Sequence, residues 1–229
     1  MIKIIVFDLD DTLFPEHEFV LSGFHAVSNW LLENCSVSGF YEIAQELFQS
    51  KKRGKIFNLA LDQLEIKHDT TLIQELVKVY REHNPNIHLH EDAAWAINYF
   101  RKHKKMGMIT DGYLKTQKNK VKALNISSNF DAVIYSDSYG RENWKPSLLP
   151  YQKLMEVTKC QGNECLYIGD NPQKDFVTAK KLGWRTIRIK RQGGEYSDIS
   201  VEDSYAADID ITSLFCLEEV LSYFSQTYL

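Results

Sequence analysis

The chain has 229 residues, enough to bury one large core or a core with a second, smaller unit. Its 27 lysines and arginines against 31 aspartates and glutamates give a net charge of -4, and no basic stripe favours nucleic-acid binding. No apolar run could span a bilayer, acids interrupt the first run too early for a signal segment, and the four cysteines lack paired spacing, so we expect a reduced, cytoplasmic protein without membrane contacts.

The first apolar run, Ile-Ile-Val-Phe at residues 4–7, is followed directly by Asp8, Asp10 and Asp11. A run of this kind is typical of a strand that is buried on both faces, as in a parallel sheet covered by helices. The carboxyl ends of such strands are where α/β proteins bind ligands. Because the three acids repel one another, their clustering predicts either open solvent or a bound cation, and we favour the cation.

Residues 15–85 are predicted to form only helices, because apolar residues recur there at spacings of three and four without a convincing strand. The helical patterns cover residues 19–31, 40–48, 56–64 and 72–80. The turn signal Asn84-Pro85-Asn86 ends this block. We therefore divide the chain into a core of residues 1–14 and 86–229 and a helical insertion of residues 15–85.

Beyond the insertion, predicted strands alternate with predicted helices. The strands are expected at residues 106–109, 132–135, 166–168 and 185–189, with residues 207–211 as a candidate edge strand. Repeated alternation implies right-handed crossovers and a parallel sheet with helices on both faces. Because parallel strands end at one edge of the sheet, the polar residues that follow them can converge. The converging set is Asp8, Asp10, Thr110, Lys145, Asp170 and Asp175.

This set combines several carboxylates with one hydroxyl and one ammonium group. Carboxylates without nearby histidine or thiolate suit Mg²⁺. The hydroxyl of Thr110 and the ammonium group of Lys145 suit a phosphoryl group. Two like charges 4 Å apart repel by about 4 kcal/mol at an effective dielectric constant of 20, so a phosphate needs both the cation and the lysine to approach. The combination is typical of a phosphoryl-transfer site.

Four motifs in this order resemble those of the haloacid dehalogenase superfamily of hydrolases. They are Asp-Leu-Asp-Asp-Thr at 8–12, Thr110 after an apolar strand, Lys145 before a proline, and Gly-Asp-Asn-Pro-Gln-Lys-Asp at 169–175. The resemblance covers nearly the whole chain. It implies a Rossmann-like sheet of strand order 5-4-1-2-3 with a helical cap inserted after the first strand. The chain is also similar to the N-acylneuraminate-9-phosphatase and nucleotidase-like branch.

The resemblance implies a role for each residue at the end of the first strand. Asp8 is expected to be the nucleophile that forms an aspartyl phosphate. Asp10 is expected to protonate the leaving oxygen and then to activate water. The ligands of Mg²⁺ are expected to be a carboxylate oxygen of Asp8, the backbone carbonyl of Asp10 and the side chain of Asp170.

The remaining motif residues are expected to act on the phosphoryl group. Thr110 and Lys145 hold its oxygens. Asp175 supports the site without contacting the phosphoryl group directly, or it orients Lys145. An acid at position 10 favours a phosphatase, because dehalogenases of the family lack it and the ion-pumping members carry threonine. We therefore expect Mg²⁺-dependent hydrolysis of a small phosphomonoester, of the sugar phosphate or nucleotide class. A phosphomutase, or a non-catalytic binding module that retains the fold, is the alternative.

Two features of the cap leave alternatives open. Its aromatic residues are interpreted as cap core, although some, Phe14 and Phe19 especially, could line the pocket of the leaving group. The basic cluster from Lys51 to Lys55 is interpreted as a solvated turn, with contact to a second anionic group of the substrate as the alternative.

Overall fold

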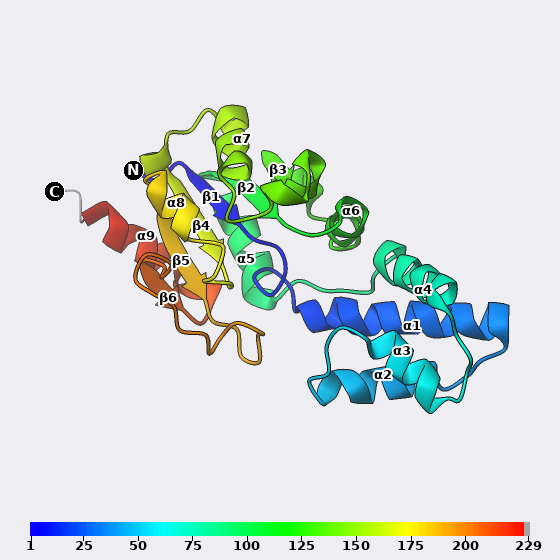
Figure 1. Cartoon of the computed structure of the whole chain (residues 1–229). Helices are drawn as coiled ribbons and strands as arrows, with labels where there is room; N and C mark the ends of the chain where they lie inside the picture. Colours follow the sequence, from blue (N-terminus) through cyan, green and yellow to red (C-terminus); the bar gives the residue numbers. More distant parts are fainter. Residues whose placement is uncertain (227–229) are drawn as a thin grey trace.

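Six strands form one sheet in the computed structural model, which describes residues 1–226 (Figure 1). The order across the sheet is β3-β2-β1-β4-β5-β6, and all neighbours are parallel. The strands are β1 (Ile4–Phe7), β2 (Lys105–Thr110), β3 (Ala132–Tyr135), β4 (Cys165–Gly169), β5 (Arg185–Ile189) and β6 (Ile209–Ile211). The predicted α/β class with a Rossmann-like parallel sheet is therefore confirmed.

The observed strand order differs from the predicted order by one strand. Read from β5, the sheet follows 5-4-1-2-3 as expected, and β6 is added at the edge beside β5. All three residues of β6 pair with β5, and Asp210 is exposed between the less exposed Ile209 and Ile211. This alternation is typical of a half-buried edge strand.

The side chains of the central strand β1 enter two layers of the core, one on each face of the sheet. Its four residues are fully buried, and alternate side chains point to opposite faces. Ile5 and Phe7 pack into the layer that contains α5 (Glu91–Phe100) and α9 (Leu217–Gln226). Ile4 and Val6 pack into the layer that contains α7 (Leu148–Thr158) and α8 (Val177–Lys181). Helices on both faces explain why this strand is apolar throughout.

The remaining helices surround the carboxyl edge of the sheet. Helix α6 (Leu114–Ala123) follows β2, and α1 (Glu16–Cys35), α2 (Phe40–Gln49), α3 (Ile56–Gln63) and α4 (Thr70–Glu82) form a group beside the sheet (Figure 1). These four helices pack around a core of their own that includes Val27, Leu31 and Leu76. The residues predicted as the insertion contain these helices and no strand. The division of the chain into core and cap stays a prediction.

Short 3₁₀ segments connect several of these elements, at Ser127–Asn129, Ser136–Tyr139, Arg141–Asn143, Gly162–Glu164 and Leu214–Cys216. Among residues 1–226, we find no helix with the length and apolar character that a membrane span requires.

Candidate active site

Asp8 lies at the carboxyl end of β1, in the middle of the sheet. Its backbone N–H donates to the carbonyl of Ile168 on the neighbouring strand, which extends the sheet by one residue. Its side chain is almost fully buried, and its Oδ1 lies 2.7 Å from Nζ of Lys145. Burial raises the pKa of Asp8 to about 6, and the positive charge of Lys145 opposes this rise.

Lys145 is fixed on its other sides by two residues near the end of β4. Its Nζ lies 2.8 Å from Oδ1 of Asp175 and donates to the hydroxyl of Tyr167 at 2.8 Å. The other carboxylate oxygen of Asp175 accepts the backbone N–H of Asn171 at 3.0 Å. Burial alone would lower the pKa of Lys145, but the carboxylates of Asp175 and Asp8 raise it well above its usual value. The lysine is therefore a fixed positive charge beside Asp8.

The segment that carries Asp175 forms a turn ahead of the helix that follows β4. Helix α8 begins only at Val177, because residues 171–175 form a turn in which the backbone N–H of Asp175 donates to the carbonyl of Asn171. This turn aims the carboxylate of Asp175 back toward Lys145.

Asp170 lies at the same edge of the sheet, after β4. Its side chain is buried and accepts no hydrogen bond from any residue between 1 and 226. Carboxylate oxygens of Asp8, Asp170 and Asp175 lie within 4.8 Å of one another. Burial, together with the charges of Asp175 and Asp8, raises the pKa of Asp170 well above its usual value. Three buried carboxylates that face one another, with only one lysine among them, fit a hard divalent cation.

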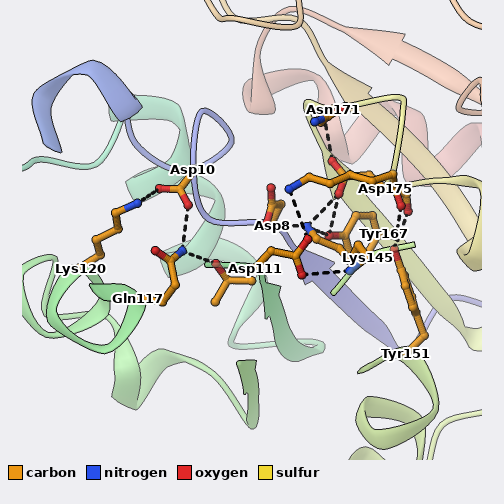
Figure 2. A network of polar contacts seen from close by, with 12 residues as sticks. Asp8, Asp10, Asp111, Gln117, Lys120, Lys145, Tyr151, Tyr167, Asn171 and Asp175 are labelled. Carbon is orange, nitrogen blue, oxygen red and sulfur yellow. Dashed lines mark hydrogen bonds and ion pairs between the residues drawn. The ribbon is translucent and has the colours of Figure 1, made fainter. Parts of the chain in front are cut away.

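The side chain of Asp10 points away from this cluster, toward α6 (Figure 2). Its carboxylate accepts hydrogen bonds from Nζ of Lys120 at 2.6 Å and from Nε2 of Gln117 at 2.8 Å. Gln117 also donates to the hydroxyl of Thr110 at 2.6 Å, and Thr110 is fully buried. The structure thus brings Asp8, Lys145, Asp170 and Asp175 together, and it joins Asp10 to Thr110 through Gln117.

Asp111 and Lys174 also belong to the polar network, although the sequence prediction did not include them. The carboxylate of Asp111 accepts the backbone N–H of Lys145 at 3.1 Å and lies 3.3 Å from Nζ of Lys174. Both residues directly neighbour predicted ones, so their place in the motifs could have indicated them. Gln117 and Lys120 lie within α6 and belong to none of the predicted motifs, so only the packing of this helix reveals them.

A cavity of about 150 Å³ lies beside Asp8, Asp10 and Asp170. That volume equals about five water molecules, which is enough for a phosphoryl group beside an ion. Burial and the nearby charge of Asp10 raise the pKa of Glu16, at the cavity wall, to about 7. The cavity is lined by Asp8, Asp10, Glu16, Asp111, Gly112, Trp144, Asp170, Asn171, Lys174 and Tyr196.

Residues 5–189 match the family model described as haloacid dehalogenase-like hydrolase. A glyceraldehyde 3-phosphate phosphatase of Methanocaldococcus jannaschii is 32% identical, over 96% of this chain and 97% of that protein. The pyrophosphatase PpaX of Bacillus mycoides is 25% identical, over 82% of this chain and 83% of that protein.

Two solved structures share the arrangement of sheet and helices. A phosphatase of the same family from Thermococcus onnurineus is 23% identical, with a TM-score of 0.63 over 96% of this chain and 98% of its own. The hydrolase YfnB of Bacillus subtilis, solved with bound magnesium, is 17% identical, with a TM-score of 0.68 over 96% of this chain and 98% of its own. At these identities, the two structures establish the shared fold alone.

Proposed function

Because the chain belongs to the haloacid dehalogenase-like hydrolase family, we propose that it is a Mg²⁺-dependent phosphatase that hydrolyses a small phosphomonoester through an aspartyl phosphate on Asp8. The prediction of the family and of a phosphatase-type hydrolase is confirmed by the comparisons. The names of the relatives, which refer to glyceraldehyde 3-phosphate and to pyrophosphate, support a small phosphorylated substrate. The observation that carries the proposal is the buried contact of Asp8 with Lys145, beside the unpartnered carboxylate of Asp170.

In the first step, a carboxylate oxygen of Asp8 attacks phosphorus while the bond from phosphorus to the ester oxygen breaks. Asp10 gives its proton to the departing oxygen, so that the leaving group departs as an alcohol. The carboxyl group of Asp10 lines the cavity, and Gln117 and Lys120 hold it there.

In the second step, water attacks the aspartyl phosphate and gives a proton to Asp10. The bond between phosphorus and the oxygen of Asp8 breaks, and inorganic phosphate leaves. Lys145 stays paired with Asp175 and Tyr167 throughout, so its charge faces the phosphoryl oxygens without reorganisation. Thr110 is proposed to hold another phosphoryl oxygen once Gln117 releases its hydroxyl.

Asp8, Asp170 and the backbone carbonyl of Asp10 are the proposed ligands of Mg²⁺. The bound ion would neutralise the phosphate and the carboxylates as they approach one another. Asp175 is the least suitable ligand among the three clustered acids, because Lys145 and the N–H of Asn171 already bind both of its oxygens. This choice agrees with the chemistry of the donors, which are oxygens only.

The test is the release of inorganic phosphate from phenyl phosphate in the presence of Mg²⁺. We expect Asp8→Asn to lose activity by at least about 10³-fold, because the amide cannot form the acyl phosphate. Asp210→Asn, at an exposed residue of β6, is the matched control and should keep wild-type activity. Wild-type turnover in Asp8→Asn would overturn the mechanism. A phosphomutase would move phosphate within a sugar without releasing it.

A further inference from the structure

A second, larger cavity adjoins the one beside Asp8. Its volume is about 570 Å³, and its walls come from α1 to α4 and from the loop after β5. Glu16 lines both cavities, so they meet at this side chain. The volume equals about nineteen water molecules and falls in the range of roughly 300–1,000 Å³ that is typical of sites for larger organic ligands. A three-carbon leaving group would leave most of this space unfilled.

About half of the residues that line this larger cavity are aromatic or aliphatic. Phe24, Phe48, Phe57 and Tyr80 lie at its surface and come from four different helices. Their rings touch edge to face or tilted, with centroids 6.1 Å apart for Phe24 and Phe48 and 5.6 Å apart for Phe57 and Tyr80. Phe14 and Phe19, by contrast, pack into the core of the sheet. An aromatic lining of this kind favours a flat, apolar ligand group.

The acidic and basic residues of the same cavity lie on different parts of its wall. Asp11, Glu16 and Glu195 lie toward the catalytic cavity or on the loop after β5. Two arginines also line the cavity. The guanidinium carbon of Arg81, on α4, lies 3.8 Å from the ring centroid of Tyr113, which is not part of the lining, and Arg53 lies in the connection between α2 and α3. The guanidinium carbon of Arg53 lies 4.5 Å from the ring centroid of Phe48. A leaving group that entered this cavity from Asp8 would pass Glu16, which lines both cavities, and would meet the aromatic residues and Arg53.

Only one nitrogen of the Arg53 guanidinium group donates hydrogen bonds within residues 1–226. Its Nη1 donates to the backbone carbonyls of Phe48 at 3.2 Å and Lys52 at 3.0 Å. No carboxylate within residues 1–226 pairs with it, and its Nη2 and Nε make no hydrogen bond in that part of the chain. An arginine that is oriented by its own backbone and lacks an acidic partner is well placed to bind an anion through two parallel hydrogen bonds.

We propose that the substrate is a phosphomonoester with a flat, largely apolar leaving group that bears a second anionic group, and that Arg53 binds this second anion. The proposal rests on the phosphatase activity proposed above and specifies its substrate class. The second anion is a carboxylate or a phosphate, because the guanidinium fork fits both. Arg53 is thus separated from the rest of the basic cluster at residues 51–55, whose lysines do not line the cavity.

The experiment compares the hydrolysis of 4-carboxyphenyl phosphate, phenylene bisphosphate, phenyl phosphate and glyceraldehyde 3-phosphate. In Arg53→Gln, we expect KM for the two substrates with a second anion to rise about tenfold or more, with kcat unchanged. KM for phenyl phosphate should stay within about twofold, because that substrate offers no second charge. Whichever of the two doubly anionic substrates shows the larger change identifies the second anion as carboxylate or phosphate.

Lys52→Gln is the matched control, because this neighbouring lysine is exposed and does not line the cavity. Binding of 4-hydroxybenzoate, the product of the carboxylated substrate, gives a readout that does not depend on turnover. Calorimetry should show weaker binding to Arg53→Gln than to the wild type and unchanged binding to Lys52→Gln.

The failures of the two proposals can be told apart. Absence of phosphate release from every substrate, including phenyl phosphate, would overturn the proposed function. Phosphate release with glyceraldehyde 3-phosphate as the preferred substrate, and with equal KM values in Arg53→Gln and the wild type, would overturn the inference on Arg53 alone.

Discussion

At the scale of single residues, the placement of Asp10 depends on two side chains of α6. Lys120 is buried, and its ammonium group lies 2.6 Å from the carboxylate of Asp10 and 4.3 Å from the ring centroid of Phe19 on α1. Gln117 binds the second oxygen of the same carboxylate. Without these donors, the carboxylate of Asp10 would sample several rotamers, and we infer that they position it for proton transfer.

Substitution of Lys120 by methionine tests this positioning role. We expect kcat/KM for an alkyl phosphate to fall by about tenfold or more, because its leaving oxygen needs a proton from Asp10. The kcat/KM for 4-nitrophenyl phosphate should change by less than about threefold, since nitrophenolate departs without protonation. Steady-state kinetics with both substrates measures the contrast, and Lys122→Met, at an exposed position of the same helix, is the control. Equal losses on both substrates would contradict the positioning role.

At the scale of elements, α6 connects the helical group to the candidate site. Thr116 and Asn119 donate to the backbone carbonyls of Arg81 and Glu82 at the carboxyl end of α4, at 2.9 and 2.8 Å. Gln117 and Lys120, each one residue further along α6, bind Asp10. Residues three apart share one side of a helix, so two adjacent sides of α6 contact α4 and Asp10. A shift of α4 relative to the sheet would therefore move α6 and change the position of the Asp10 carboxylate.

A second connection joins α5 to the loops that follow β1 and β5. The carboxylate of Asp92 accepts hydrogen bonds from Nη1 of Arg191 at 2.7 Å and from the N–H of Leu214 at 2.7 Å. Arg191 also donates to the carbonyl of Thr12 at 2.7 Å. Burial alone would raise the pKa of Asp92, but the hydrogen bonds from Arg191 and Leu214 lower it below its usual value.

A lowered pKa in the folded state means that the charge of Asp92 stabilises the protein above the unfolded-state pKa, about 3.9. This contribution is lost as the pH falls through the lower pKa of the folded state. We expect Asp92→Asn to reduce the free energy of unfolding by about 3 kcal/mol at neutral pH, because it leaves Arg191 unpaired. The difference from the wild type should shrink below about pH 4.

Urea denaturation at neutral pH and at the lowest pH at which the protein stays folded measures this change. Asp210→Asn removes an exposed pair with Lys190 and should cost less than about 1 kcal/mol. A pH-independent loss in Asp92→Asn would show that the charge of Asp92 does not carry the effect.

The same elements show what could be predicted from the sequence. Strands β1 to β4 were predicted because each is centred on a short apolar run, and β5 was predicted although its sequence Arg-Thr-Ile-Arg-Ile is mixed. Asp8, Lys145, Asp170 and Asp175 were predicted to meet because parallel strands end at one edge. The direction of the Asp10 side chain was not predictable, because it depends on donors from α6 that are distant in the sequence. The role of Arg53 in the cavity wall likewise depends on how α2 and α3 pack, which periodicity alone does not determine.

At the scale of the whole molecule, the chain packs around separate cores. The helices α1 to α4 enclose one core, and the sheet with its covering helices encloses the others. The polypeptide passes between the two parts twice, before α1 and after α4 (Figure 1). The larger cavity has walls from both parts, so its shape depends on how they sit against each other. We infer that the two parts can open locally without unfolding each other.

Leu31→Ala tests this inference in the helical part. Leu31 is fully buried in the core of α1 to α4, and we expect its truncation to cost about 2–5 kcal/mol. Amide hydrogen exchange should quicken in α1 to α4 and stay unchanged in β1 to β5, because the substitution removes contacts from one core alone. Leu154→Ala, at a fully buried residue of α7 in the core of the sheet, should give the opposite pattern. Faster exchange throughout the chain in both variants would mean that the protein unfolds as one cooperative unit, and the division at residues 15–85 would then be wrong.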